Sequence, residues 1–120
     1  MKNLKNEILQ NLEWNVFRYD INSGNIVVYN IFDNISFFED VEDIFENKDF
    51  LDFGTFSNKL NSAAQYTFWS RFQYEISIGG LSENDKQFKK DVYDQLLLNW
   101  ESFATHVYSK YHSWYFEKNN

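Results

Sequence analysis

The chain has 120 residues, enough for one domain and too few for two comfortable ones, and its 11 Lys and Arg against 18 Asp and Glu give a net charge of −7. Aromatic residues make up 21% of the chain, and Cys and Pro are absent. These counts exclude a disulfide scaffold, a zinc site built on thiolates and a disordered acidic tail. The acidic balance also argues against direct binding of nucleic acid, whose phosphates are gripped by Lys and Arg.

The start of the chain predicts an intracellular protein. Its first twelve residues, MKNLKNEILQNL, contain no apolar stretch of the length that a signal peptide needs. No aliphatic run is longer than that at residues 96–98, which is far too short to span a bilayer. We therefore expect a cytoplasmic protein with no membrane partner.

The first elements in chain order are a short helix and a hairpin. Helical spacing of apolar residues predicts the helix near the N-terminus, at Leu4, Ile8, Leu9 and Leu12. Residues 14–31 predict a β-hairpin, because strand-forming residues flank the turn sequence Asn22-Ser23-Gly24-Asn25. Gly24 suits this turn because glycine adopts positive φ without strain.

Two helices are predicted next. Ser36 and Glu39 have the spacing of a capping box and predict a helix over 36–46, with an apolar stripe formed by Phe37, Phe38, Val41, Ile44 and Phe45. Thr55 can cap a second helix of about 17 residues. Its stripe is Phe56, Leu60, Ala63, Ala64, Phe68 and Phe72.

A second hairpin and a last helix complete the predicted order. Tyr74, Ile76 and Ile78 alternate with polar residues, which predicts a half-buried strand that ends at Gly79-Gly80. Residues 88–93 read as a short return strand, and Asp94 can cap the last helix. The apolar stripe of that helix is Leu97, Trp100, Phe103 or Ala104, Val107 and Tyr111.

The sequence therefore predicts an α+β fold in the order α-ββ-αα-ββ-α. A small antiparallel sheet of two hairpins would pack against three to four helices. No repeat or low-complexity linker interrupts the chain, so residues 1–120 are expected to form a single domain.

The sequence carries no motif of an enzyme or a metal site. His106 and His112 lie six residues apart, which does not place them on the same face of a helix. There is no nucleophile elbow and no glycine-rich phosphate loop. We expect no catalytic residue, no metal and no cofactor.

The charge is concentrated in one segment. Eight carboxylates and one lysine lie between residues 33 and 52, whereas the other 100 residues contain ten acids and ten bases. On a helix, two carboxylates four residues apart are separated by about 6 Å along the axis. A row of such carboxylates can resemble a strand of phosphates to a protein that binds nucleic acid. The alternative is a solvated face that keeps an aromatic-rich protein soluble. The acids are Asp33, Glu39, Asp40, Glu42, Asp43, Glu46, Asp49 and Asp52.

A second candidate site lies around one of the two arginines. If the second hairpin forms, it brings carboxylates near Arg71, which can bridge them bidentately. One interpretation is a polar pocket formed by Trp69, Arg71, Glu75, Asp91 and Asp94. The other is an ion-pair network that fixes the junction and caps the last helix.

The C-terminal tail is rich in aromatic residues. Tyr and Trp are favoured at protein contacts because one end of each side chain tolerates water. Tyr111, Trp114 and Tyr115 can therefore form such a contact, or they can pack back onto the core.

Several segments together resemble a known family. They are Tyr29-Asn30-Ile31-Phe32-Asp33, Phe68-Trp69-Ser70-Arg71, Tyr74-Glu75-Ile76, and Asp91-Val92-Tyr93-Asp94-Gln95 with Asn99-Trp100. Over most of residues 14–108 the chain resembles a largely uncharacterised family of small phage, prophage and mobile-element proteins of low-GC bacteria. Members often carry a Cys where this chain has Phe72 and Gln73, which argues against a thiol-dependent role. The resemblance implies an accessory gene, a context in which inhibitors of host defence are common.

Three functions follow from these observations. The leading hypothesis is a non-enzymatic, anti-CRISPR-like protein that inhibits a nucleic-acid-handling defence protein of the host, such as a CRISPR effector, through its acidic helix and exposed aromatics. The first alternative is a small-molecule or nucleotide-binding or processing pocket at Arg71, Glu75, Asp91 and Asp94. The second is a phage accessory domain that self-associates through its aromatic tail.

Overall fold

The computed structural model describes residues 4–47, 52–80 and 82–118 and shows an α+β protein that is mostly helical. Within these residues β1 and β2 are the only strands, and they form a two-stranded antiparallel sheet. The elements are α1 (Leu4–Gln10), β1 (Asn15–Asp20), β2 (Asn25–Asn30), the 3₁₀ turn η1 (Ile31–Asp33), α2 (Ile35–Glu46), α3 (Phe53–Gln65), the π-helix η2 (Tyr66–Ser70), α4 (Arg71–Ser77), α5 (Glu83–Leu98) and α6 (Trp100–Lys118).

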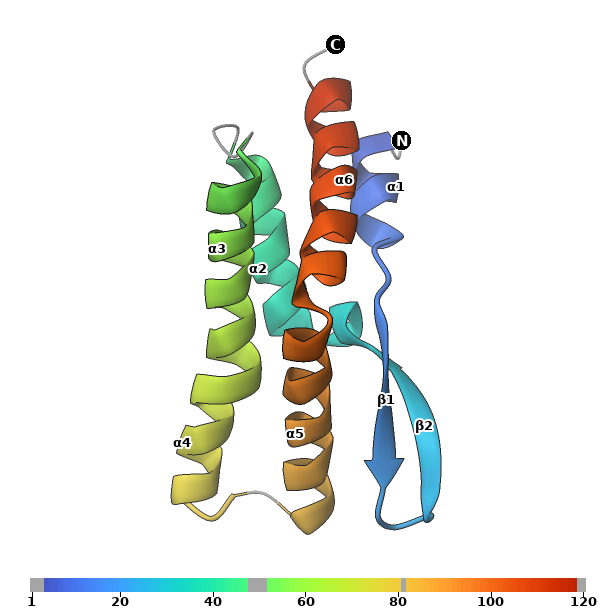
Figure 1. Ribbon diagram of the computed structural model, residues 1–120, viewed down its shortest axis with the longest axis vertical. Helices are drawn as coiled ribbons and strands as arrows, with labels where there is room; N and C mark the ends of the chain where they lie inside the picture. Colours follow the sequence, from blue (N-terminus) through green and yellow to red (C-terminus); the bar gives the residue numbers. More distant parts are fainter. Residues whose placement is uncertain (1–3, 48–51, 81, 119–120) are drawn as a thin grey trace.

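The helices form two long columns (Figure 1). The first column is α3, η2 and α4, and the second is α5 and α6, with Asn99 between the two helices. The upper half is completed by α2, which packs against α3 and α6, and by α1, which lies along α6. The hairpin lies beside α5 in the lower half, and α5 is the helix against which β1 mainly packs.

The first hairpin is confirmed. Asn15 pairs with Asn30 and Asp20 with Asn25, in a regular antiparallel register. The turn places Gly24 at a φ of 73°, and its N–H donates to the carbonyl of Asp20 at 2.8 Å. Glycine is required there because an L side chain is strained at this backbone angle.

The helix predicted over 36–46 is also confirmed, but a different residue caps it. Asn34 precedes α2, and its side-chain oxygen accepts the N–H of Phe37 at 3.0 Å. Ser36, predicted as the cap, lies inside the first turn. At α3 the cap is Asp52 rather than Thr55, because Asp52 accepts the N–H of Thr55 at 2.9 Å. At α3 the correction agrees with the stronger preference of Asp than of Thr for the N-cap position, whereas at α2 Asn34 and Ser36 are equally suitable residues and the helix begins one residue earlier than predicted.

The second predicted hairpin is wrong, because its two strands are helical. Residues 74–77 belong to α4, and residues 88–93 lie inside α5. The Gly79 N–H donates to the carbonyl of Ile76 at 3.0 Å and the Gly80 N–H to that of Glu75 at 3.1 Å, which is the Schellman arrangement at the end of a helix. Gly79-Gly80 therefore ends a helix and not a strand.

The alternation at residues 74–78 was misleading for a physical reason. Tyr74 and Ile78 are more than 60% exposed, so the apolar residues of this segment do not mark a buried face. The start of α5 carries its own signal, since the hydroxyl of Ser82 accepts the N–H of Asp85 at 3.2 Å. As α5 begins at Glu83, Asp94 lies within this helix and caps nothing.

The core contains a cluster of aromatic rings that come from several elements. Phe103 of α6 lies with its ring centroid 5.4 Å from Trp14, 6.1 Å from Phe32 and 6.3 Å from Phe37. Phe37 continues the cluster to Phe68, at 5.2 Å. A single aromatic cluster thus joins α2, η1, η2 and α6.

The Schellman arrangement gives a test of the corrected fold. Gly79 has a φ of 70°, so Gly79→Ala is expected to lower the free energy of unfolding by about 1 kcal/mol in urea denaturation. Gly80→Ala is the matched control, because a Cβ there meets only ordinary contacts, the nearest at 3.7 Å, and its effect should be small. A two-residue hairpin turn of type I′ needs positive φ at both positions, so an equal loss in both variants would contradict the helix end.

Candidate functional site

The acidic segment forms the outward flank of α2. Its inward face is buried through Phe37, Val41, Ile44 and Phe45. Glu39, Asp43 and Glu46 are exposed, while Asp40 and Glu42 are partly covered. The helical arrangement predicted for these carboxylates is confirmed, and Glu39 and Asp43, four residues apart, are separated by about 6 Å along the axis.

The charges on this flank repel one another. Among the described residues, no lysine or arginine forms an ion pair with Glu39, Asp40, Glu42 or Asp43. Burial, together with the neighbouring Asp43 and Glu39, raises the pKa of the Asp40 carboxyl. The flank of α2 therefore carries four carboxylates, those of Glu39, Asp40, Glu42 and Asp43, that no lysine or arginine among the described residues neutralises.

Two other acids of the segment, Asp33 and Asp52, lie outside α2. Asp33 is exposed at the end of η1. Asp52 caps α3, and the bonds that it accepts from the N–H and the hydroxyl of Thr55 lower the pKa of its carboxyl. Asp49 lies outside the described residues. The candidate surface thus consists of the five carboxylates of α2, with a structural role for Asp52.

The predicted polar pocket is divided in the structure. Arg71 Nε lies 3.4 Å from Glu75 Oε1, and Lys89 Nζ of α5 lies 3.4 Å from Glu75 Oε2. The Arg71 side chain is 54% exposed, so its charge is not buried. Trp69 stacks on Tyr93 with ring centroids 5.3 Å apart and leaves 44% of its surface exposed.

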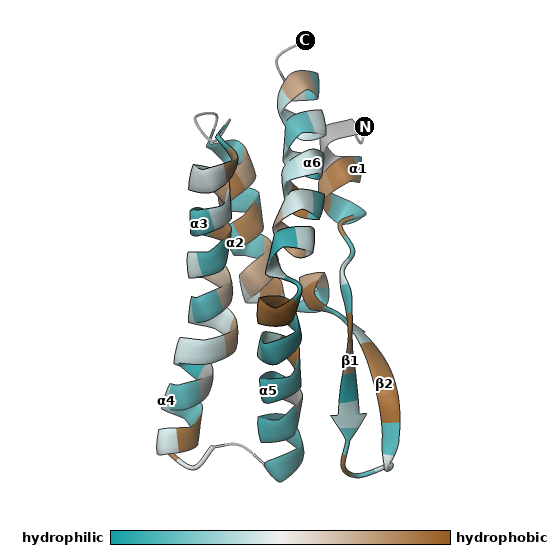
Figure 2. Cartoon of the chain, viewed as in Figure 1, coloured by the Kyte–Doolittle hydropathy of each residue, from teal (hydrophilic) through white to brown (hydrophobic). Residues whose placement is uncertain are grey.

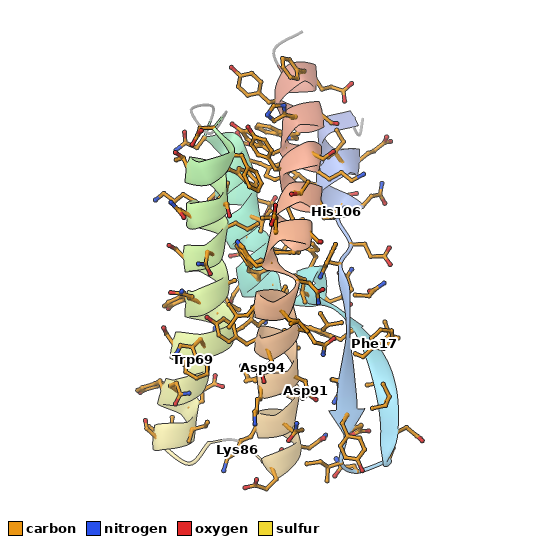
Figure 3. The ribbon with its side chains drawn as sticks, viewed as in Figure 1. Phe17, Trp69, Lys86, Asp91, Asp94 and His106 are labelled. Carbon is orange, nitrogen blue, oxygen red and sulfur yellow. The ribbon has the colours of Figure 1, made fainter. Side chains whose placement is uncertain are left out.

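Asp91 and Asp94 lie on α5 (Figure 3), and neither forms an ion pair with Arg71 or Lys89 among the described residues. The Asp91 carboxylate accepts the N–H of Tyr19 at 3.1 Å and the Gln87 amide at 2.9 Å. Asp94 is exposed. The prediction that Asp91 and Asp94 share a pocket with Arg71 depended on the second hairpin, and it fails because α5 directs Asp91 to the sheet.

The contact between α5 and β1 is made by side chains that bind a strand edge. Gln95 accepts the N–H of Phe17 at 2.8 Å and donates to the Phe17 carbonyl, as a neighbouring strand would. Asp91 and Asn84 accept the next two outward N–H groups, those of Tyr19 and Ile21. One face of α5 thus substitutes for a third strand of the sheet.

The other side of the hairpin is left open. The residues opposite Phe17 and Tyr19 are Val28 and Ile26. Because antiparallel residues alternate in direction, the N–H groups of Val28 and Ile26 point away from β1, and the described residues supply no partner for them. These four side chains share one face of the sheet and are 43–64% exposed, and β2 is strongly apolar in Figure 2.

A cavity of about 400 Å³ lies where α2, η2, α4 and α5 meet. Arg71 and Glu75 line it, as the pocket prediction required, but its other main polar residues were missed: Ser36, Thr67 and Lys89. The four-residue spacing of Arg71 and Glu75 is the one sequence signal for it, because it is typical of a helical ion pair. The other three residues come together only through tertiary packing.

The predicted aromatic contact in the tail is wrong for two of its three members. Tyr111 is 0% and Trp114 1% exposed, and both pack against Phe45. Tyr115 is partly buried against the core. Of the two alternatives for the tail, packing onto the core therefore holds for Tyr111 and Trp114.

The histidines pack against aromatic rings. His106 lies 5.5 Å from Trp14 and His112 lies 4.4 Å from Tyr108, measured between ring centroids. Three or more His, Asp or Glu side chains do not converge on a metal-sized site anywhere in the part of the chain that the structure describes.

No protein-family model, no curated protein and no solved structure matches the chain. The resemblance to mobile-element proteins therefore stays a prediction. Over residues 4–47, 52–80 and 82–118, no helix has the length and apolar character needed to cross a membrane.

The raised pKa of Asp40 predicts an unusual pH dependence. When a carboxyl has a higher pKa in the folded state than in the unfolded state, its ionisation lowers the stability of the folded protein. This loss of stability is absent below the unfolded pKa of about 3.9, and it is complete once the pH has risen through the folded pKa. Asp40→Asn should therefore raise the melting temperature at pH 7 and leave it unchanged at pH 3, as followed by circular dichroism. Asp94→Asn, at an exposed position of α5, is the control. An equal rise at both pH values would contradict the electrostatic cause.

The edge contact predicts a clear effect of Gln95. Gln95→Ala leaves the N–H and carbonyl of Phe17 without their partner and should lower the free energy of unfolding by about 1–2 kcal/mol in urea. Asp94→Ala changes the neighbouring exposed residue and should stay within about 0.5 kcal/mol of the wild type. Equal effects at the two positions would show that the contact adds nothing to stability.

Proposed function

We propose that the protein is a non-enzymatic inhibitor that binds a nucleic-acid-handling protein, such as a CRISPR effector of a bacterial defence system. The single observation that carries the proposal is the row of exposed carboxylates on α2, in which Glu39 and Asp43 form no ion pair with a lysine or arginine among the described residues. The mobile-element setting comes from the sequence resemblance alone.

The α2 row suits a basic groove for two reasons. It is rigid, because the opposite face of the helix is held in the aromatic core by Phe37 and Phe45, both 0% exposed. A rigid row of charges binds without the loss of freedom that a flexible acidic tail suffers. Complementary charge then speeds encounter and sets the orientation of the two proteins.

The aromatic anchors expected in the tail have no part in this proposal. Tyr111 and Trp114 are core residues, so a partner that contacts α2 does not reach them. The acidic flank has to supply the recognition, which makes binding strongly dependent on ionic strength.

The test is the affinity for purified CRISPR effectors, measured by biolayer interferometry at low and high salt. The variant Glu39→Gln/Asp43→Asn/Glu46→Gln removes three exposed carboxylates of the row. We expect it to weaken binding at least about tenfold at low salt, and we expect the affinity of the wild type to fall as salt is added.

A matched variant separates the row from net charge. Asp85→Asn/Asp94→Asn/Glu101→Gln changes the total charge by the same amount at exposed positions of α5 and α6. This variant should bind nearly as well as the wild type. If both triple variants lose affinity equally, or if binding is indifferent to salt and to the α2 variant, recognition by the acidic row is contradicted.

A further inference from the structure

The cavity beside Arg71 is separate from the outward flank of α2. It is lined by residues of β2, η1, the first turn of α2, η2, α4 and α5, together with Asn34. Its volume of about 400 Å³ lies within the range of sites for small ligands. A site there is independent of the acidic row.

A buried hydroxyl in this cavity has no partner. Thr67 is 2% exposed and lines the cavity, and its Oγ1 accepts or donates no hydrogen bond among the described residues. A buried polar atom without a partner costs folding free energy, so such atoms call for an explanation. Thr67 lies in the π-helical turn η2, and interruptions of this kind in an α-helix occur frequently at functional sites.

Two cations on the cavity wall are held in place. Glu75 lies 3.4 Å from both the Arg71 guanidinium and the Lys89 ammonium, with one carboxylate oxygen for each. Arg71 Nη1 also donates to the Ser36 hydroxyl at 3.4 Å. A guanidinium and an ammonium carry further N–H donors, which remain for a ligand.

The start of α2 adds backbone donors to the same wall. Asn34 accepts the N–H of Phe37, which leaves the N–H groups of Ile35 and Ser36 at the open end of a twelve-residue helix. The first turn of α2 contains no acidic residue, although the rest of the helix is rich in them. A helix start with free N–H groups favours an anion.

Two carboxylates also line the cavity, and neither removes this preference. Glu75 is already shared between Arg71 and Lys89. Asp33 is exposed, so solvent and salt screen its charge. The remaining groups are mainly donors, and they come from side chains and backbone on different elements.

We propose that this cavity binds a compact oxyanion, a phosphate group that is either free or carried by a small metabolite. The Arg71 guanidinium, the Lys89 ammonium, the Thr67 hydroxyl and the first N–H groups of α2 would contact its oxygens. Charge-assisted hydrogen bonds of this kind are the strong ones, and a planar guanidinium suits a tetrahedral oxyanion.

The test is a titration followed by two-dimensional ¹H–¹⁵N NMR. Inorganic phosphate and ribose 5-phosphate are added in separate arms, with acetate as the control anion at equal ionic strength. We expect saturable shifts of the Ile35, Ser36 and Thr67 amides with a Kd of about 1 mM or below. Tighter binding of ribose 5-phosphate identifies an esterified ligand, and equal binding of the two identifies free phosphate. Either result supports the site.

Three variants separate a ligand site from a structural ion pair. Arg71→Gln should weaken phosphate binding about tenfold or more, and Thr67→Val about threefold or more. Lys90→Gln removes the exposed lysine next to Lys89 and should leave the affinity unchanged. Thermal unfolding verifies that each variant is folded.

Thr67→Val decides between the two roles of the hydroxyl. If Oγ1 is only a buried polar atom without a ligand, the change to valine raises the melting temperature and leaves phosphate binding as it was. If phosphate shifts no amide of the cavity, or shifts the same amides in Arg71→Gln with the same affinity, the proposal is overturned and the cavity holds only water.

Discussion

The contact between Phe37 and Phe103 is the constraint on which the rest of the structure depends. Phe103 brings α6 against Trp14 and Phe32, which flank the hairpin in the sequence, and Phe37 brings α2 against Phe68 of η2. Because these two rings meet, α2 is held with its carboxylates outward and its first turn against η2. The acidic row and the cavity are therefore two consequences of one packing arrangement. In a chain this short, large rings bury enough surface to hold several short elements at a single point.

The local part of the fold could be predicted from the sequence, and the part that depends on packing could not. The first hairpin was predicted because a glycine turn lies between strand-forming residues, and α2 because its apolar residues recur at helical spacing. The stripe Phe56, Leu60, Ala64, Phe68 repeats every four residues, which in a regular α-helix drifts by about 40° per step. The π-helical turn η2 accommodates wider spacing, so the column continues into α4, where alternation of exposed residues imitated a strand.

The same distinction applies to the candidate sites. The acidic row was visible because its members are neighbours in sequence, and a helix preserves their spacing. The cavity was not, because Ser36, Thr67 and Lys89 come from three different elements and only the aromatic core brings them together. The prediction that Asp91 lies in a pocket with Arg71 depends on the second hairpin, which the structure does not contain. A carboxylate that binds a strand edge has no comparable signature.

The open edge of β2 has a consequence for how copies of this protein behave when they are crowded. Natural sheets protect such edges with lysine, proline or a bulge, and β2 has none of these in Asn25–Asn30. Two such strands can align side by side, which makes the hairpin a starting point for aggregation. A net charge of −7 on every copy opposes that approach, and added salt weakens the opposition. The negative charge of this chain therefore also has a role between molecules, because it keeps the exposed edges of β2 in different copies apart.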